Sequence, residues 1–240
     1  MTTPSVSWLD FWKEEKIFAP EDWSKSLEVF TRSLGSILTF DPKDTVLDVG
    51  CGPGGLARFL QGKISEFHGL DVSERYVAGC RDEFRIYPNF HFDTLGSDYL
   101  DFSMVGDRTF DKIICFSVVQ YYRNEDELIR LIDEVRKFMH KGSKFLIGDI
   151  ALKSSPGKAA WSSMKKAYQD GYLLKQLAFL SRAVRSNYQM ALKQQGFLEF
   201  TEPDLKRLVD HVAATRPVKV QLLDIPLALK ENRRHILIEA

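Results

Sequence analysis

The ten residues from Val46 to Gly55 read VLDVGCGPGG, and they decide the fold of this 240-residue chain. The run from Val46 to Val49 is typical of a buried strand, and the four glycines that follow are typical of a tight turn. A helix is expected to begin directly after them. A strand that leads through a glycine-rich turn into a helix predicts a place where the backbone lies close against a ligand.

Strand and helix signals alternate along the rest of the chain, and this alternation predicts a parallel sheet covered by helices. The expected strands are Thr45–Val49, Glu66–Leu70, Phe90–Asp93, Phe110–Phe116 and Lys144–Ile150. The expected helices are Gly55–Leu60, Glu74–Phe84, Asp126–Met139 and Asp204–Val212. Two last strand signals, Val218–Ile225 and His235–Ile238, predict an antiparallel hairpin. We therefore expect an α/β fold with a doubly wound, mostly parallel sheet of seven strands that ends in this hairpin.

Two helical segments are expected outside this alternation. Residues 1–40 carry apolar side chains at helical spacing and predict two helices that cover the site, ahead of a main domain at residues 41–240. Residues 151–200 predict a helical insertion above the sheet. Its apolar stripe is expected to be packed in the interior; it consists of Trp161, Met164, Tyr168, Leu177, Leu180, Val184 and Tyr188.

The composition restricts the classes of function. The 33 basic and 33 acidic side chains cancel, which argues against DNA as a partner of the whole chain. No apolar run approaches the roughly 20 residues that span a bilayer, and no leader is recognisable, so we expect a cytoplasmic protein without membrane insertion. The three scattered cysteines, Cys51, Cys80 and Cys115, indicate reduced thiols, and no ligand-spaced Cys/His pair predicts a metal.

An acidic residue after the glycine turn indicates which ligand the turn binds. Asp71 ends the expected second strand, 21 residues after Gly50, where a carboxylate can accept hydrogen bonds from ribose hydroxyls. Gly50, Gly52 and Gly55 also satisfy the GxGxxG pattern of nicotinamide-dependent oxidoreductases, so the glycines alone leave both cofactor classes open. Asp48 favours a ligand with a positive charge, because its carboxylate would repel a pyrophosphate.

Taken together, these motifs resemble those of the class I methyltransferases that use S-adenosylmethionine (SAM) on a Rossmann-like domain. The resemblance covers roughly residues 44–150. It rests on Val46–Gly55, on Gly69-Leu70-Asp71-Val72-Ser73, on Ser97-Asp98-Tyr99, on Phe110–Ile114 and on Phe138–Gly148. One departure is the turn Lys141-Gly142-Ser143, which stands where the family usually has proline and two glycines.

The resemblance implies a set of site residues. Cofactor contacts are expected from Asp48, Gly50, Cys51, Gly52, Gly54, Asp71, Val72, Ser97, Asp98, Tyr99 and Phe116. Ser117 and Tyr122 would contact the acceptor, and Tyr121 is the candidate catalytic base. The expected activity is in-line methyl transfer to a small molecule. The alternatives are a nicotinamide-dependent oxidoreductase and a module that binds SAM without catalysis; the oligomeric state is left open.

The charge of the insertion suggests what the acceptor is. Residues 151–195 include eight basic residues and only one acidic residue, Asp170, although the chain as a whole is neutral. A positive field at the carboxyl ends of the strands would attract an anionic acceptor. Arg182 and Arg185 are the expected contacts, because guanidinium groups bind carboxylates and phosphates bidentately.

Overall fold

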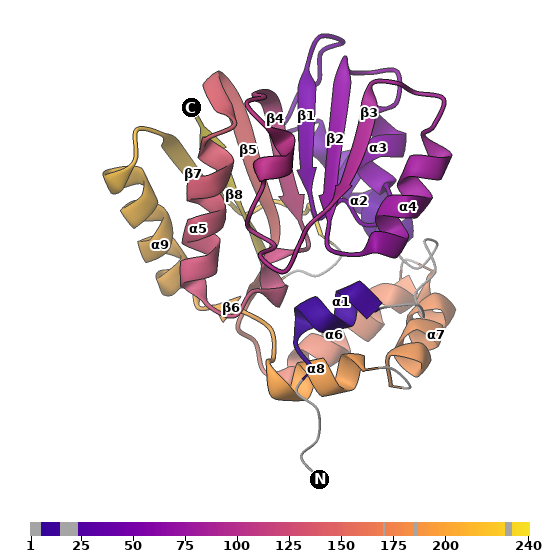
Figure 1. Ribbon diagram of the computed structural model, residues 1–240. Coiled ribbons are helices and arrows are strands. Elements are labelled where there is room, and N and C mark those ends of the chain that lie inside the picture. Colours follow the sequence, from indigo (N-terminus) through magenta and orange to yellow (C-terminus); the bar gives the residue numbers. More distant parts are fainter. Residues whose placement is uncertain (1–5, 15–23, 170, 185–186, 229–231) are drawn as a thin grey trace.

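The computed structural model describes residues 6–14, 24–169, 171–184, 187–228 and 232–240, and its centre is a sheet of eight strands (Figure 1). The order is β3-β2-β1-β4-β5-β8-β7, with β6 paired to β5 outside this path. The pairings of β7 and β8 are antiparallel and all others are parallel. The strands are β1 Thr45–Val49, β2 Glu66–Asp71, β3 Phe90–Thr94, β4 Phe110–Phe116, β5 Met139–Leu152, β6 Glu199–Phe200, β7 Lys219–Leu223 and β8 Arg233–Glu239.

Helices cover both faces of the sheet because successive strand residues point to opposite sides. Leu47 and Ile113 face α5 (Glu125–Arg136) and α9 (Glu202–Thr215). Their neighbours Val46 and Ile114 face α2 (Ser24–Leu34), α3 (Gly55–Leu60) and α4 (Glu74–Glu83). The predicted doubly wound α/β sheet with a closing hairpin is thus confirmed. The three cysteines are free and buried.

The expected boundaries differ most from the structure at the junction of α5 and β5. The expected helix Asp126–Met139 ends at Arg136, and β5 begins at Met139 instead of Lys144. The Lys141-Gly142 turn lies inside β5 as an irregularity, where the pairing with β4 shifts between Phe110 and Lys112. The two-residue strand β6 was not predicted, since so short a segment carries no periodic signal.

A layer of helices lies beyond the carboxyl ends of the strands (Figure 1). It consists of α1 (Trp8–Glu14) from the amino-terminal segment and of α6 (Pro156–Gln169), α7 (Leu173–Val184) and α8 (Tyr188–Gln194) from the insertion. Within the described residues, no helix is both long and apolar enough to span a bilayer.

The expected packing of the insertion's apolar stripe was largely wrong. The buried positions of these helices are the small residues Ala167, Ala183 and Ala191. Met164 and Tyr188 are half-buried, whereas the remaining large residues of the stripe are exposed: Trp161, Tyr168, Leu177, Leu180 and Val184. Alanines permit close helix contacts, so the larger side chains lie on the outer surface.

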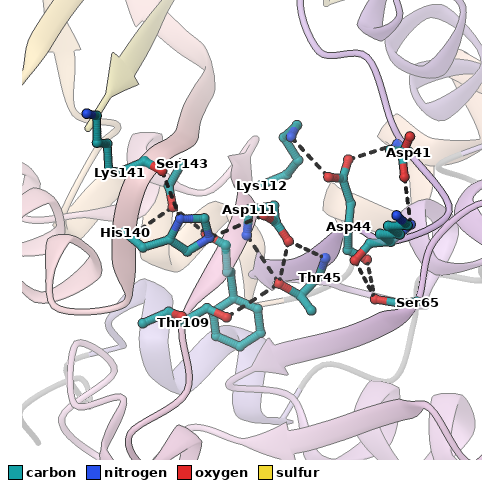
Figure 2. A network of polar contacts seen from close by, with 12 residues as sticks. Asp41, Asp44, Thr45, Ser65, Thr109, Asp111, Lys112, His140, Lys141 and Ser143 are labelled. Atoms are coloured by element: carbon teal, nitrogen blue, oxygen red, sulfur yellow. Dashed lines mark hydrogen bonds and ion pairs between the residues drawn. The ribbon is translucent and has the colours of Figure 1, made fainter.

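A network of polar contacts closes the amino ends of β1 and β4 (Figure 2). The Asp111 carboxylate accepts hydrogen bonds from the backbone N–H and the hydroxyl of Thr45, at 2.8 and 2.9 Å. His140 lies 3.2 Å from the other oxygen of Asp111, and Lys112 lies 3.3 Å from Asp44. These contacts satisfy the polar groups at this end of the sheet and leave the carboxyl ends for a binding site.

Candidate active site

A cavity of about 760 Å³ opens at the carboxyl ends of the strands, where β1 lies beside β4. Its volume lies within the roughly 300–1,000 Å³ of small-molecule sites. At this position the strand order reverses, and open α/β sheets bind ligands at such a reversal. The amino-terminal segment lines the cavity through Trp12 and through residues of α2: Lys25, Ser26, Leu27 and Phe30.

The turn after β1 forms one wall of the cavity. Gly50 and Gly52 have φ angles of 80° and 53°, which L residues with side chains rarely adopt. A Cβ at Gly50 would overlap the side chain of Val118, whereas a Cβ at Gly52 would meet nothing within 4 Å. Gly52 thus leaves open space in the cavity. Cys51 also lines it, but Gly54 does not; a Cβ at Gly54 would approach Cys80 Sγ.

Asp71 ties this turn to the end of β2. One carboxylate oxygen accepts the backbone N–H of Gly52 at 2.8 Å, and the other accepts that of Ser73 at 2.8 Å. Burial raises the pKa of Asp71, and these backbone hydrogen bonds oppose the rise. Each oxygen keeps a further lone pair, so the carboxylate can also accept hydroxyl groups of a ligand in the cavity.

Asp48 places a second buried carboxyl group in the same cavity. Burial, together with the charge of Asp71, raises the pKa of Asp48 to about 8. An ionised carboxylate is costly in such surroundings, so a positively charged ligand would be favoured there.

Two of the four residues expected beside an adenine ring line the cavity, and two do not. Val72 and Tyr99 line it. The Tyr99 hydroxyl donates a hydrogen bond to Glu127 at 2.6 Å. Ser97 and Asp98 do not belong to the lining. The Asp98 carboxylate accepts the backbone N–H of Leu100 at 3.2 Å and pairs with Arg130 at 2.5 Å, which explains why its pKa is lowered.

A polar cluster, of which the sequence analysis predicted only Ser117, lines the cavity at β4, β5 and β8. Ser117 follows β4 and Asp149 lies in β5, and both have positive φ angles, 61° and 64°. The Ser117 hydroxyl donates to the Asp149 carboxylate at 2.5 Å, and Arg233 Nε lies 3.1 Å from its other oxygen. The backbone N–H of Asp149 donates to His235 Nδ1 at 3.0 Å. Strained residues persist where the surroundings hold them, and they cluster at functional sites.

The two tyrosines after β4 are held by aromatic neighbours. The ring of Tyr121 lies 5.0 Å from that of Trp8, and the ring of Tyr122 stacks on Tyr99 at 5.6 Å. Burial raises the pKa of both tyrosines well above its ordinary value. Because a phenolate is disfavoured there, Tyr121 suits the role of hydrogen-bond donor better than that of the expected base. Phe116 lines the cavity and stacks on Phe30 at 3.9 Å.

The two arginines expected to bind the acceptor do not line the cavity in the described chain. Arg182 is half-buried and outside the lining, and Arg185 lies outside the described residues. The insertion instead contributes Tyr172, Lys175, Gln176 and Tyr188 to the lining, and β8 contributes Arg233. Helical periodicity shows which residues share a face, but it does not show how the helix is rotated toward the cavity.

Comparison with known proteins relates part of the chain to a described family. Residues 46–142 match the family described as "Methyltransferase domain". The mRNA cap guanine-N(7) methyltransferase of Cryptococcus neoformans is 27% identical over 136 residues, which are 50% of this chain and 22% of that protein. The chain thus spans about a fifth or less of the length of the curated relatives it matches.

Solved structures share the fold at low sequence identity. A complex between the Haloferax volcanii Trm112 methyltransferase activator and a putative methyltransferase matches with a TM-score of 0.62 at 12% identity, over 98% of both chains. The DhpI-SAM-HEP complex matches with a TM-score of 0.59 at 13% identity, over 100% of both chains. Magnesium protoporphyrin IX methyltransferase from Synechocystis PCC 6803 with bound SAH matches with a TM-score of 0.53 at 15% identity, over 99% of this chain and 90% of that chain.

Proposed function

We propose that this chain is a class I SAM-dependent methyltransferase that transfers the methyl group of SAM to a small acceptor molecule. One observation carries the proposal. One cavity is lined both by the glycine turn with its two carboxyl groups and by the polar cluster of Ser117, Asp149 and Arg233.

The residues of the glycine turn fit SAM. The open space at Gly52 leaves room for a ligand, and the Asp71 carboxylate beside it can accept ribose hydroxyls. Asp48 gains from a nearby positive charge, which the sulfonium and ammonium groups of SAM carry. Val72 and Tyr99 would contact the adenine ring. Roles for Ser97, Asp98 and Gly54 stay predictions, because these residues do not line the cavity.

The chain has three tasks in this reaction. Bound SAM supplies a methyl group that is already strongly electrophilic, so no protein nucleophile is required. Trp12 and the stacked rings of Phe30 and Phe116 line the cavity and would keep water from its centre. The polar cluster of Ser117, Asp149 and Arg233 would hold the acceptor in line with the methyl group, and such positioning can remove a large part of a reaction barrier.

Asp149 is our candidate for holding the acceptor's proton. An acceptor hydroxyl or amine would donate a hydrogen bond to its carboxylate and release its proton there as the new bond to carbon forms. Ser117 and Arg233 orient this carboxylate through the contacts at 2.5 and 3.1 Å. The exposed Lys175, which lines the cavity, would favour an acceptor that carries an anionic group.

The test is an incubation of the protein with methyl-labelled SAM and a metabolite extract, followed by identification of the labelled product by mass. We expect one labelled small molecule, and we expect Asp149→Asn to abolish labelling while it still binds S-adenosylhomocysteine (SAH) in a calorimeter. Binding of SAH without labelling of any small molecule would support a non-catalytic SAM-binding module. Binding of NADH in place of SAH would support a nicotinamide-dependent oxidoreductase.

A further inference from the structure

We infer that the outer surface of α6 and α7 is a docking surface for an anionic lipid membrane. The apolar side chains of this surface are Trp161, Tyr168, Leu174, Leu177, Leu180 and Val184, and we call them the α6–α7 patch. They are six of the eight exposed large hydrophobic residues in the described part of the chain; the other two are Ile86 and Met104. An exposed apolar patch of this kind marks an interaction site.

The spacing of the patch places its members on one side of each helix. On α6, Trp161 and Tyr168 are seven residues apart, which is two helical turns. On α7, Leu174, Leu177 and Val184 follow one another at intervals of three and seven. Leu174 is 82% exposed and Trp161 is 74% exposed, so these side chains have no cover within the described chain. Both helices therefore turn an apolar side toward solvent.

The charge of the insertion favours an anionic occupant. Residues 151–195 hold eight basic side chains and one acidic one. Lys153, Lys165, Lys175 and Lys193 are exposed. Trp and Tyr beside aliphatic residues, flanked by lysines, form the composition of helices that lie in the interface of anionic bilayers.

Two other occupants fit the same observations less well. A two-fold contact between copies of this chain would bring the same basic surface face to face, and like charges repel. A nucleic acid would use the lysines and aromatic rings, but it offers nothing to the aliphatic stripe of Leu174, Leu177, Leu180 and Val184.

The helix that carries most of the patch also lines the cavity, but with its other side. Lys175, which lines the cavity, lies roughly 180° around α7 from Leu177 and Val184 of the patch. Docking would thus leave α7 between the cavity and the lipid surface. The docking itself does not depend on the proposed function.

The experiment is a flotation assay with two kinds of vesicle, one of phosphatidylcholine alone and one of equal parts phosphatidylcholine and phosphatidylserine. We expect binding to the anionic vesicles only, and we expect it to fall at high salt. Leu174→Glu combined with Leu177→Glu should reduce this binding at least about tenfold. The matched control is Ile86→Glu, which changes an exposed apolar residue outside the patch and should bind normally.

Titration with SAH separates this test from the proposed function, because all variants should keep their affinity for SAH. Three results would overturn the docking surface: no binding to either vesicle, binding that the double variant retains, or a dimer in solution that the double variant dissociates. The last result would assign the patch to a contact between copies of the chain.

Discussion

Asp48 and Asp71 lie in neighbouring parallel strands and line the same cavity, with the carboxyl group of Asp48 fully inside the protein. Burial first and the charge of Asp71 second raise the pKa of Asp48 to about 8. Without a ligand, Asp48 therefore holds its proton at neutral pH. A cationic ligand beside it would reverse this preference.

Binding of SAM should therefore release a proton. At pH 7 a carboxyl group with a pKa of about 8 is about 90% protonated, so up to about 0.9 proton would leave if the bound cation lowers that pKa below 6. Calorimetric titrations in two buffers of different ionisation enthalpy measure this release. Asp48→Asn should abolish it. Equal binding enthalpies in both buffers for the wild-type protein would argue against a cationic ligand group at Asp48.

The same pKa predicts how stability depends on pH. Because the folded-state pKa lies above the ordinary value of 3.8, the folded protein holds this proton more tightly than the unfolded chain. This contribution to the free energy of unfolding is fully present below pH 3.8, falls as the pH rises and is lost above about pH 8. Asp48→Asn should therefore raise the free energy of unfolding at pH 9 by on the order of 2 kcal/mol, and by much less at pH 4. Urea denaturation at both pH values measures the difference; an equal effect at both would contradict the predicted titration.

Gly52 and Gly62 offer a matched pair that separates strain from ligand contact. Both have positive φ, 53° and 73°, and a Cβ at either would meet nothing within 4 Å. Gly52→Val and Gly62→Val should each lower stability by roughly 1–2 kcal/mol, because valine is strained in this backbone region. Only Gly52→Val should abolish SAH binding, since only Gly52 lines the cavity. Thermal denaturation and SAH titration of both variants are the measurements, and normal binding by Gly52→Val would remove the glycine turn from the cofactor site.

The sequence predicted the part of the site whose signals are local. The apolar run, the turn and Asp71 stand within 26 residues of one another, and hydrophobic periodicity placed β1, α3 and β4 at their observed boundaries. The cluster of Asp149 and Arg233 was missed because these residues are 84 apart in the chain. They meet only because β8 inserts antiparallel beside β5. The available signal was the run Arg233-Arg234-His235 at the start of an otherwise apolar strand.

Asp71→Ala should weaken SAH binding by about 1.5–3 kcal/mol, the range for hydrogen bonds to a charged group. The variant also loses the contacts to the N–H groups of Gly52 and Ser73, so the glycine turn should become less ordered. The matched control is Asp93→Ala at the end of β3, an acid that pairs with Arg81 outside the cavity. Calorimetry should find it normal. An unchanged affinity in Asp71→Ala would exclude this carboxylate as the ribose contact.

Lys175 and Arg182 decide between two accounts of the basic insertion. Both are cations of α7, but only Lys175 lines the cavity. If an anionic acceptor enters there, Lys175→Ala should raise its Michaelis constant several-fold, and the effect should shrink at high salt because charges near solvent are screened. Arg182→Ala should leave the constant unchanged, although its half-buried side chain makes some loss of stability expected. Initial rates with the acceptor found by labelling measure both. A larger effect from Arg182→Ala would support Arg182 as the acceptor contact, as the charge of the insertion predicted. No effect from either substitution would mean that the acceptor is recognised without its charge.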